Sequence, residues 1–215
     1  SRRDYTYNDL NAIDSETAVI DGYSWLIDYD YTADAYLRQI TYPNKIVVDY
    51  APNALGHATK AGSYASNVLY HPNGLLKSFI LGNGVTESIS QTTLGQPKEF
   101  ASSKSVYLSR FKYAYDNVNN LTAITDLRDS SQTKSAFIYY ALDRLKGVTG
   151  PWGSANFSYD TLSNLKTKTI GSQSLTLTYN TSSNRLSTLS GSATANYAYD
   201  AHGNITNNGR NTLGY

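Results

Sequence analysis

YDNVNNL (residues 115–121), YDTLSNL (159–165) and YDAHGNI (199–205) are three copies of one pattern, in which a tyrosine and an aspartate precede a polar turn and an apolar residue. Looser copies are found elsewhere in the chain, and QTTLG (91–95), with Leu94 as its anchor, marks a further unit that lacks the tyrosine. Successive apolar anchors lie about 21 residues apart on average, and a fixed period of this kind indicates a repeat architecture. The residues that define the pattern are Tyr31, Leu37, Tyr50, Leu55, Tyr70, Leu76, Tyr115, Asp116, Leu121, Tyr139, Leu145, Tyr159, Asp160, Leu165, Tyr179, Leu186, Tyr199, Asp200, Gly203 and Ile205.

The segments beside these turns alternate as β-strands do. FKYAY (111–115) places its three aromatic residues on one face, and LTLTY (175–179) has the same alternation. A period of two residues is typical of strands, and no segment keeps an apolar period of 3.6, so we expect little or no helix. Asp, Asn, Ser and Gly favour tight turns. Each unit is therefore predicted to be a hairpin with an Asp-x-x-Gly/Asn turn.

The expected fold is all-β, made of tandem antiparallel β-hairpin repeats. Residues 23–215 accommodate about nine hairpins, and residues 1–22 remain unassigned. Open sheets rarely exceed about ten strands without curling, so we expect a curved or spiralling β-ribbon with its tyrosine-rich face inward. A parallel β-helix, which also has a period near 20 residues, is the alternative. Turns that return the chain directly beside itself favour the antiparallel ribbon.

The composition argues against several functional classes. The chain has twenty tyrosines but two tryptophans, no cysteine and a formal net charge of +1. Scattered charges give no basic stripe for nucleic acid, and no apolar run is long enough for a membrane span. The histidines (His57, His71 and His202) fall in separate predicted turns. We therefore predict no catalytic, cofactor-binding or metal-binding residue, no cofactor, and no enzyme activity.

Further segments combine similar turn and strand residues: YPN (42–44) leading to VVDY (47–50), YHPNG (70–74) and LGNGVT (81–86). With the three Tyr-Asp units, they make the chain resemble the YD/RHS repeat family of bacterial polymorphic toxins, insecticidal toxin complex C components and teneurins. The resemblance covers roughly residues 23–215. The chain contains no methionine, even at position 1, so it is expected to be a fragment or a processed product.

This resemblance implies part of a hollow YD shell that encapsulates a toxin or another polypeptide cargo. The implied partners are the remainder of the same shell and its enclosed C-terminal effector. The implied location is secreted, extracellular or at the cell surface, in bacteria. The self-cleaving segment that ends many family shells has no counterpart here, so that activity is not carried over.

A carbohydrate- or cell-surface-binding repeat module is the competing function. Wall-binding repeats also use aromatic hairpins of about 20 residues, but they usually depend on tryptophan, and only Trp25 and Trp152 are present. Edge strands also offer unpaired backbone groups, which predicts possible self-association through the edges.

Overall fold

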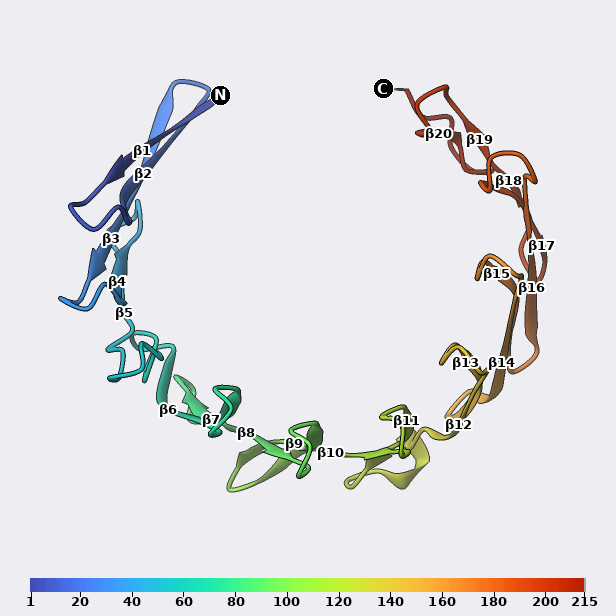
Figure 1. Cartoon of the computed structure of the whole chain (residues 1–215), viewed down its shortest axis with the longest axis horizontal. Coiled ribbons are helices and arrows are strands. Elements are labelled where there is room, and N and C mark those ends of the chain that lie inside the picture. Colours follow the sequence, from blue (N-terminus) through green and yellow to red (C-terminus); the bar gives the residue numbers. More distant parts are fainter. Residues whose placement is uncertain (215) are drawn as a thin grey trace. The chain divides into compact units, whose positions relative to one another are not determined.

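The computed structural model describes residues 1–214, and strands β1 to β20 dominate it (Figure 1). Within this described part, the only helical element is a single 3-10 turn, η1 (Ser130–Gln132). The all-β prediction is therefore confirmed. The chain divides into two compact units, one from Ser1 to Arg110 and one that begins at Phe111.

The first unit contains a five-stranded sheet in the order β1-β2-β3-β4-β5 and most of a second sheet. Strand β10 (Val106–Tyr115) belongs to this second sheet and contains the division between the units. The other strands of the first unit are β1 (Arg2–Tyr7), β2 (Ile13–Ile20), β3 (Tyr23–Tyr31), β4 (Leu37–Thr41), β5 (Val47–Asp49), β6 (Ala65–Tyr70), β7 (Leu76–Leu81), β8 (Thr86–Gln91) and β9 (Pro97–Lys104).

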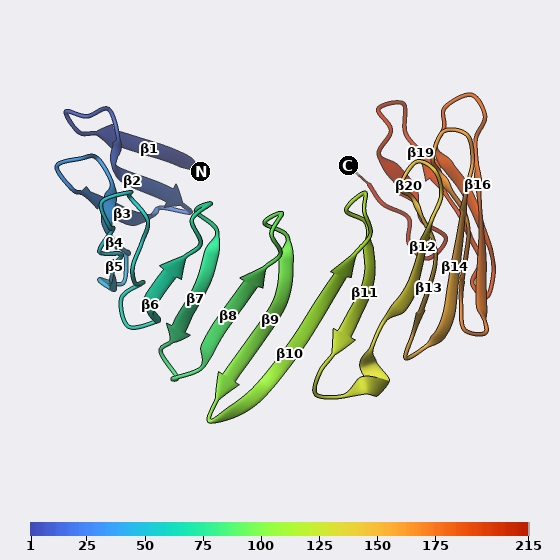
Figure 2. The same ribbon diagram turned by 60° about the horizontal axis from the view of Figure 1, so that its bottom comes forward.

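The second unit contains a seven-stranded sheet, β12 to β18 in chain order, and a small β19-β20 hairpin. Figure 2 shows strands of this sheet lying side by side in sequence order. The strands of this unit are β11 (Leu121–Asp126), β12 (Ser135–Tyr139), β13 (Leu145–Gly150), β14 (Gly153–Tyr159), β15 (Leu165–Ile170), β16 (Gln173–Tyr179), β17 (Leu186–Gly191), β18 (Ala195–Asn196), β19 (Ala198–Tyr199) and β20 (Ile205–Asn207).

The strand pairings have the direction expected of tandem hairpins. Consecutive strands pair antiparallel, as in β14 with β15 and β16 with β17. The parallel β-helix alternative is therefore wrong. The reason is the turn chemistry: a short Asx-type turn can only return the chain beside itself, whereas parallel neighbours need a long crossover.

Most of the pattern tyrosines and anchors face each other where a hairpin closes. Each such pair carries a register shift, which is a bulge beside the turn. The closing pairs are Tyr31 with Leu37, Tyr70 with Leu76, Tyr115 with Leu121, Tyr139 with Leu145, Tyr159 with Leu165, Tyr179 with Leu186 and Tyr199 with Ile205. Residues 2–20 form the same arrangement, closed by Tyr7 and Ile13.

Tyr50 and Leu55 do not form the closing pair of their hairpin. The bridge in that unit joins Pro52 to Ala58, so Ala58 holds the anchor position. Leu55 lies at the tip of the turn and is 73% exposed. In the unit that lacks a tyrosine, Pro97 pairs with Gln91 in the same way. Neither Ala58 nor Pro97 has the branched apolar side chain by which the anchors were recognised.

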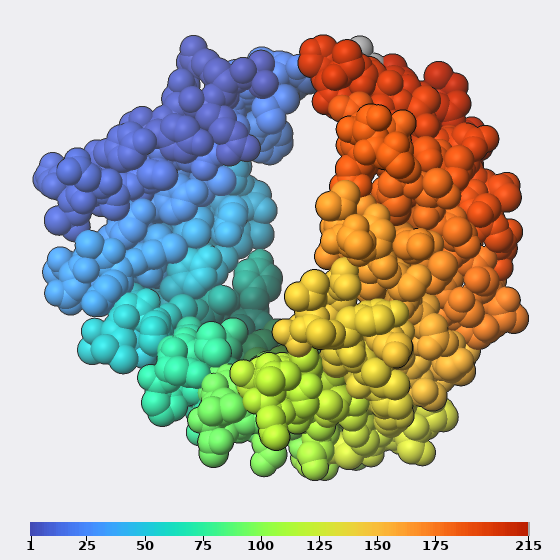
Figure 3. All heavy atoms as spheres, turned by 45° about the vertical axis from the view of Figure 1, so that its right-hand side comes forward, coloured from blue at the N-terminus to red at the C-terminus, as the bar shows by residue number. Residues whose placement is uncertain are grey.

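The sheets of both units are one layer thick. The accessible surface of the chain is 14138 Å². A compact protein of this mass exposes about 9,800 Å². The buried hydrophobic side chains are small and few: Val48, Val85, Ala101, Val148 and Ala155. In the space-filling view, the colours within each unit follow chain order, so each segment lies against its sequence neighbours (Figure 3).

The two faces of the second unit's sheet differ in chemistry. A row formed by Val148, Ala155 and Ile170 crosses three strands on one face. The opposite face carries the row Ser158, Thr167, Thr176 and Ser190. Since successive side chains point to opposite sides of a strand, one face carries apolar side chains together with Lys168, and the other is rich in hydroxyl groups.

Candidate functional site

The pattern tyrosines join neighbouring hairpins through their hydroxyl groups. Five of them donate to the backbone carbonyl of the residue at the anchor position of the preceding hairpin, at 2.7 to 3.1 Å. The pairs are Tyr31 with Ile13, Tyr70 with Ala58, Tyr139 with Leu121, Tyr179 with Leu165 and Tyr199 with Leu186. The half-buried ring covers the sheet, and the polar tip satisfies a carbonyl beside the bulge.

Burial favours the donor form of two of these hydroxyls, those of Tyr139 and Tyr179. It raises the pKa of the Tyr139 hydroxyl, and the charge of Asp116 adds to the effect. The pKa of Tyr179 is raised in the same way, by burial first and then by Asp160. Both groups therefore stay protonated over the physiological range, and the carbonyl bonds persist there.

In six of the turns, the first residue holds the turn with its side chain. Asp160 Oδ1 accepts from the backbone N–H groups of Leu162 and Asn164, both at 2.9 Å. The fourth turn residue takes a positive φ, for example 69° at Ser163. The same two acceptor bonds are made by Asp116, Asp200, Asn8, Asn53 and Thr92.

The charged turn residues have shifted acidities. Hydrogen bonding from the Asn164 side chain, followed by contacts with backbone N–H groups, holds the pKa of Asp160 below its usual value. The Asn204 side chain does the same for the pKa of Asp200. These carboxylates accept backbone bonds where a catalytic group would need to be free, so a structural role accounts for their geometry.

In the second unit, side chains also link one turn to the next. Asn120 Nδ2 donates to Asp143 Oδ1 at 2.8 Å, and Asn164 Nδ2 donates to Asn184 Oδ1 at 2.6 Å. Arg185 Nη1 donates to the carbonyl of Asp200 at 3.2 Å. We call this set of contacts between successive turns the turn ladder.

Arg144 is the most heavily used member of the turn ladder. Its Nη1 reaches the Ser163 hydroxyl at 3.0 Å and the Asp160 carbonyl at 3.3 Å. Its guanidinium lies 5.1 Å from the ring centre of Tyr159 and 5.7 Å from that of Tyr140. The two rings meet edge to face at 6.1 Å. Arg144 is therefore held by cation–π contacts and hydrogen bonds together.

The first unit fills the corresponding position with a histidine ring. His57 directly precedes the anchor position, and its ring packs against that of Tyr70 at a centroid distance of 4.5 Å. Asn73 Nδ2 continues toward the next turn by donating to Gln91 Oε1 at 3.2 Å. The residue before the anchor thus contacts the tyrosine of the next repeat at His57, Arg144 and Arg185. The sequence pattern did not include this position, although its fixed place beside the anchor would have identified it.

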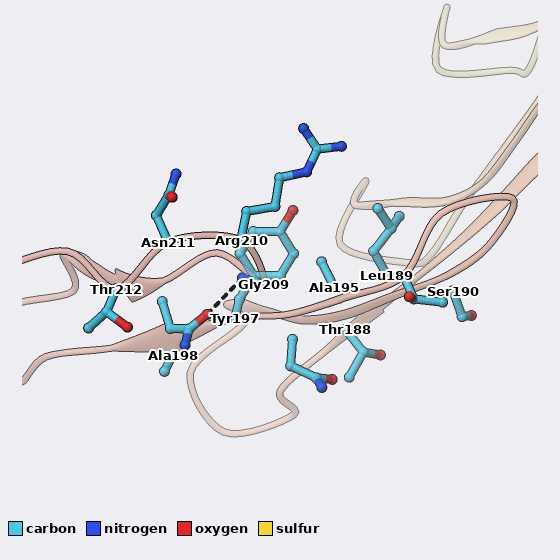
Figure 4. Close-up of a pocket in the computed structure, with 13 residues that line it drawn as sticks. Thr188, Leu189, Ser190, Ala195, Tyr197, Ala198, Gly209, Arg210, Asn211 and Thr212 are labelled. Atoms are coloured by element: carbon cyan, nitrogen blue, oxygen red, sulfur yellow. Dashed lines mark hydrogen bonds between the residues drawn. The ribbon is translucent and has the colours of Figure 1, made fainter.

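An open pocket of about 660 Å³ lies beside β17, β18 and the loop after β20 (Figure 4). Its lining is mostly polar and includes Thr188, Asn196 and Asn211. The dashed bond in Figure 4 is the 2.7 Å contact from Gly209 N to Asn207 Oδ1, which closes the loop. Arg210 is the only charged residue of the lining. These groups do not form a nucleophile–base or metal-ligand arrangement.

A second open pocket, of about 600 Å³, lies in the first unit and is lined mainly by aromatic and apolar side chains. Its lining residues are Trp25, Tyr42, Pro43, Asn44, Ile46, Val48, Tyr50, Ala61 and Tyr64, and we call it the aromatic cleft. Burial, followed by the neighbouring Tyr42, raises the pKa of the Tyr50 hydroxyl.

Within residues 1–214, no group of three or more His, Asp or Glu side chains is placed to hold a metal ion. His57 packs on a tyrosine, and His71 Nε2 lies 2.8 Å from the carbonyl of Ile89. His202 donates its backbone N–H to Asp200 within a turn. Among the described residues, no helix has the length and apolarity that a membrane crossing requires.

The chain was compared with known proteins by sequence and by structure. No family model matches it, and no curated protein matches its sequence. Solved structures do match: a crystal structure of TcdB2-TccC3-TEV at a TM-score of 0.75 and 14% identity, and one of TcdB2-TccC3 at 0.74 and 13%. Both alignments cover 94% of this chain and 14% of the other chain.

A structure of the Photorhabdus luminescens Tc holotoxin pore also matches, at a TM-score of 0.61 and 14% identity, over 95% of this chain and 12% of the other. The chain therefore spans about one seventh of the length of the proteins that it resembles. The predicted resemblance to YD/RHS shell proteins is confirmed as a likeness of fold.

Proposed function

We propose that this chain is a segment of an RHS-type shell that encloses a polypeptide cargo. The observation that carries the proposal is a one-layer ribbon of tandem hairpins that matches TcdB2-TccC3 structures over 94% of its length. A sheet with so small a core of its own is suited to being a wall, because neither face needs to be covered by a second layer for the hairpins to hold together.

The proposed mechanism is passive containment, with no chemical step. The face with Val148, Ala155 and Ile170 would line the enclosed space, and the face with the row of Ser158, Thr167 and Thr176 would meet water. Tyrosine hydroxyls already bound to backbone carbonyls leave mostly ring surface for the cargo. Such a lining tolerates an extended chain without offering it strong, specific hydrogen bonds.

The partners in this proposal are the remainder of the same shell and an effector that it encloses. Backbone groups at the outer edge of β1 would pair with the neighbouring part of the ribbon or, in an isolated chain, with a second copy. The proposed location is secreted or at the bacterial cell surface, in keeping with the Tc toxin structures that share the fold.

Limited proteolysis of the full-length protein that contains this segment tests the proposal. Enclosure predicts that one polypeptide region resists protease in the native protein and is digested at once when the shell is unfolded by denaturant. The control is the same region produced alone, which should be cleaved rapidly. A region that is cut equally fast inside and outside the native protein would contradict containment.

A further inference from the structure

The aromatic cleft of the first unit has the size and composition of a ligand site. It is formed by Trp25 on β3, by residues of the turn between β4 and β5, and by Tyr64. Its volume of about 600 Å³ falls in the range of small-molecule sites. None of its lining residues is charged.

The walls of the cleft are exposed rings around a buried floor. Trp25 is 52% exposed and Tyr64 is 56% exposed, whereas Val48 is only 7% exposed. Both rings are open to solvent beside the same hollow. Together they form a larger exposed apolar surface than a single exposed side chain would. This surface is rigid in its centre, because Val48 belongs to β5 and pairs with Ile40 of β4.

The rim of the cleft carries polar atoms that have no protein partner. In the described part of the chain, no hydrogen bond is made by Trp25 Nε1, the Tyr64 hydroxyl or Asn44 Nδ2. The other atom of the Asn44 amide, Oδ1, accepts from Ile46 N at 3.1 Å, which holds this side chain in place. The cleft thus combines flat apolar surface with a few free donors and acceptors.

We propose that the aromatic cleft binds a neutral sugar. One face of a pyranose ring presents C–H groups that pack on Trp25 and Tyr64, and its hydroxyls would reach the free polar atoms at the rim. The uncharged lining disfavours phosphorylated or acidic sugars, which lose hydration without gaining a counter-charge. A purely hydrocarbon ligand would cover the rim atoms without pairing them, and this carries a cost in free energy.

This site is separate from the proposed enclosure of cargo, because it requires only the first unit's own residues. Its affinity should be modest, since an open cleft orders few ligand groups. We expect dissociation constants of about 1 mM for a disaccharide.

Saturation-transfer NMR on the whole 215-residue chain tests the site. The probes are cellobiose, lactose, maltose and N,N′-diacetylchitobiose, which differ in stereochemistry and in their acetamido groups. At least one is expected to bind. Trp25→Ala should weaken that binding at least about tenfold, and Trp152→Ala, in the second unit, should leave it unchanged.

Tyr64→Phe separates stacking from hydrogen bonding, because it keeps the ring and removes the hydroxyl. It should reduce the affinity by about threefold to tenfold, and circular dichroism will show whether each variant keeps its sheet. The proposal is overturned if none of the four sugars binds at about 10 mM, or if binding survives Trp25→Ala. It is also overturned if a proline-rich or apolar peptide binds the cleft and the sugars do not. Failure of cargo protection in the full-length protein would leave the sugar result unaffected.

Discussion

The two compact units build the same turn with different chemistry. Three turns of the first unit use a side-chain amide or hydroxyl to accept the turn's backbone N–H groups, and three turns of the second unit use a carboxylate. The first set is Asn8, Asn53 and Thr92, and the second is Asp116, Asp160 and Asp200. An acceptor at the first position therefore does not need a charge, and the turns that begin with His71 and Tyr140 form the same backbone bonds without a side-chain acceptor there. The aspartates of the second unit place a charged acceptor in the same turn geometry.

The residue directly before the anchor position also differs between the two units. The first unit places the ring of His57 on Tyr70, whereas the second places the guanidiniums of Arg144 and Arg185 on Tyr159 and Tyr199. The contact with the next tyrosine is thus retained while its chemistry changes. We infer that ring coverage is the common requirement, and that the added hydrogen bonds of arginine are specific to the second unit.

Removing the tyrosine ring should destabilise a hairpin more than the other changes do. The loss should be equal in the two units, because both use the tyrosine in the same way. Tyr70→Ala and Tyr179→Ala each lose half-buried ring packing and a carbonyl bond, so each should destabilise its hairpin by about 2 kcal/mol. Hydrogen exchange measured segment by segment will give the local free energies. An effect below about 0.5 kcal/mol in one unit would show that its tyrosine plays a different part.

Truncating the residue before the anchor should destabilise the two units by different amounts. Arg144→Ala loses contacts with two rings and two hydrogen bonds, so we expect a loss of about 1.5 kcal/mol. His57→Ala loses one ring contact, with an expected cost of about 0.7 kcal/mol. Local exchange rates of the following strands provide the measurement. Equal costs at the two positions would refute a distinct role for the arginine hydrogen bonds.

Removing only the tyrosine hydroxyl should cost less than removing the ring. Tyr70→Phe and Tyr179→Phe leave the carbonyls of Ala58 and Leu165 without their donor, at about 1 kcal/mol each. Tyr23→Phe is the matched control, because Tyr23 is 72% exposed and the change should be nearly neutral. If the control and the test variants behaved alike, the hydroxyl bonds would not contribute to stability.

Acid should act on the second unit's turns while sparing those of the first. The pKa of Asp160 is lowered in the folded state, chiefly by the Asn164 side chain. Its carboxylate therefore stabilises the turn at pH values above its unfolded pKa of about 3.9. This contribution is lost as the pH falls through the lower folded-state pKa.

Amide chemical shifts will reveal this difference between the units. We expect the amide resonance of Leu162 to titrate in acid and that of Leu55, bonded to the neutral Asn53, to remain constant. Asp160→Asn keeps an acceptor oxygen and should abolish the titration of Leu162 with little change in stability at pH 7. A Leu162 titration that persists in this variant would assign the effect to another group.

The sequence pattern carried enough information to predict the hairpins, their direction and the role of the turn aspartates. It located seven closing pairs of a tyrosine and a branched apolar residue, but it did not find the pair of Tyr7 and Ile13 within residues 1–22. At Ala58 and Pro97 the closing position is set by turn geometry, and the conspicuous Leu55 and Leu94 lie at exposed turn tips. A search for leucine therefore selected the wrong place in these two units.

Other features had no signal in the local sequence. The tyrosine hydroxyls bond to backbone carbonyls, which every residue possesses, so no residue type marks the acceptor. The aromatic cleft assembles side chains from Trp25 to Tyr64 that meet only after three strands have paired. Trp25 alone was not distinguishable from an ordinary packing residue.

The extensive contacts in this chain join elements that are neighbours along the sequence. A hairpin added or deleted as a complete unit would thus disturb only the two junctions on either side of it. The length of such a ribbon can consequently change in steps of one hairpin, by duplication or loss of about 20 codons, without any redesign of the remaining units. Unfolding should likewise begin at free ends and progress stepwise, which makes the terminal hairpins the first to fray.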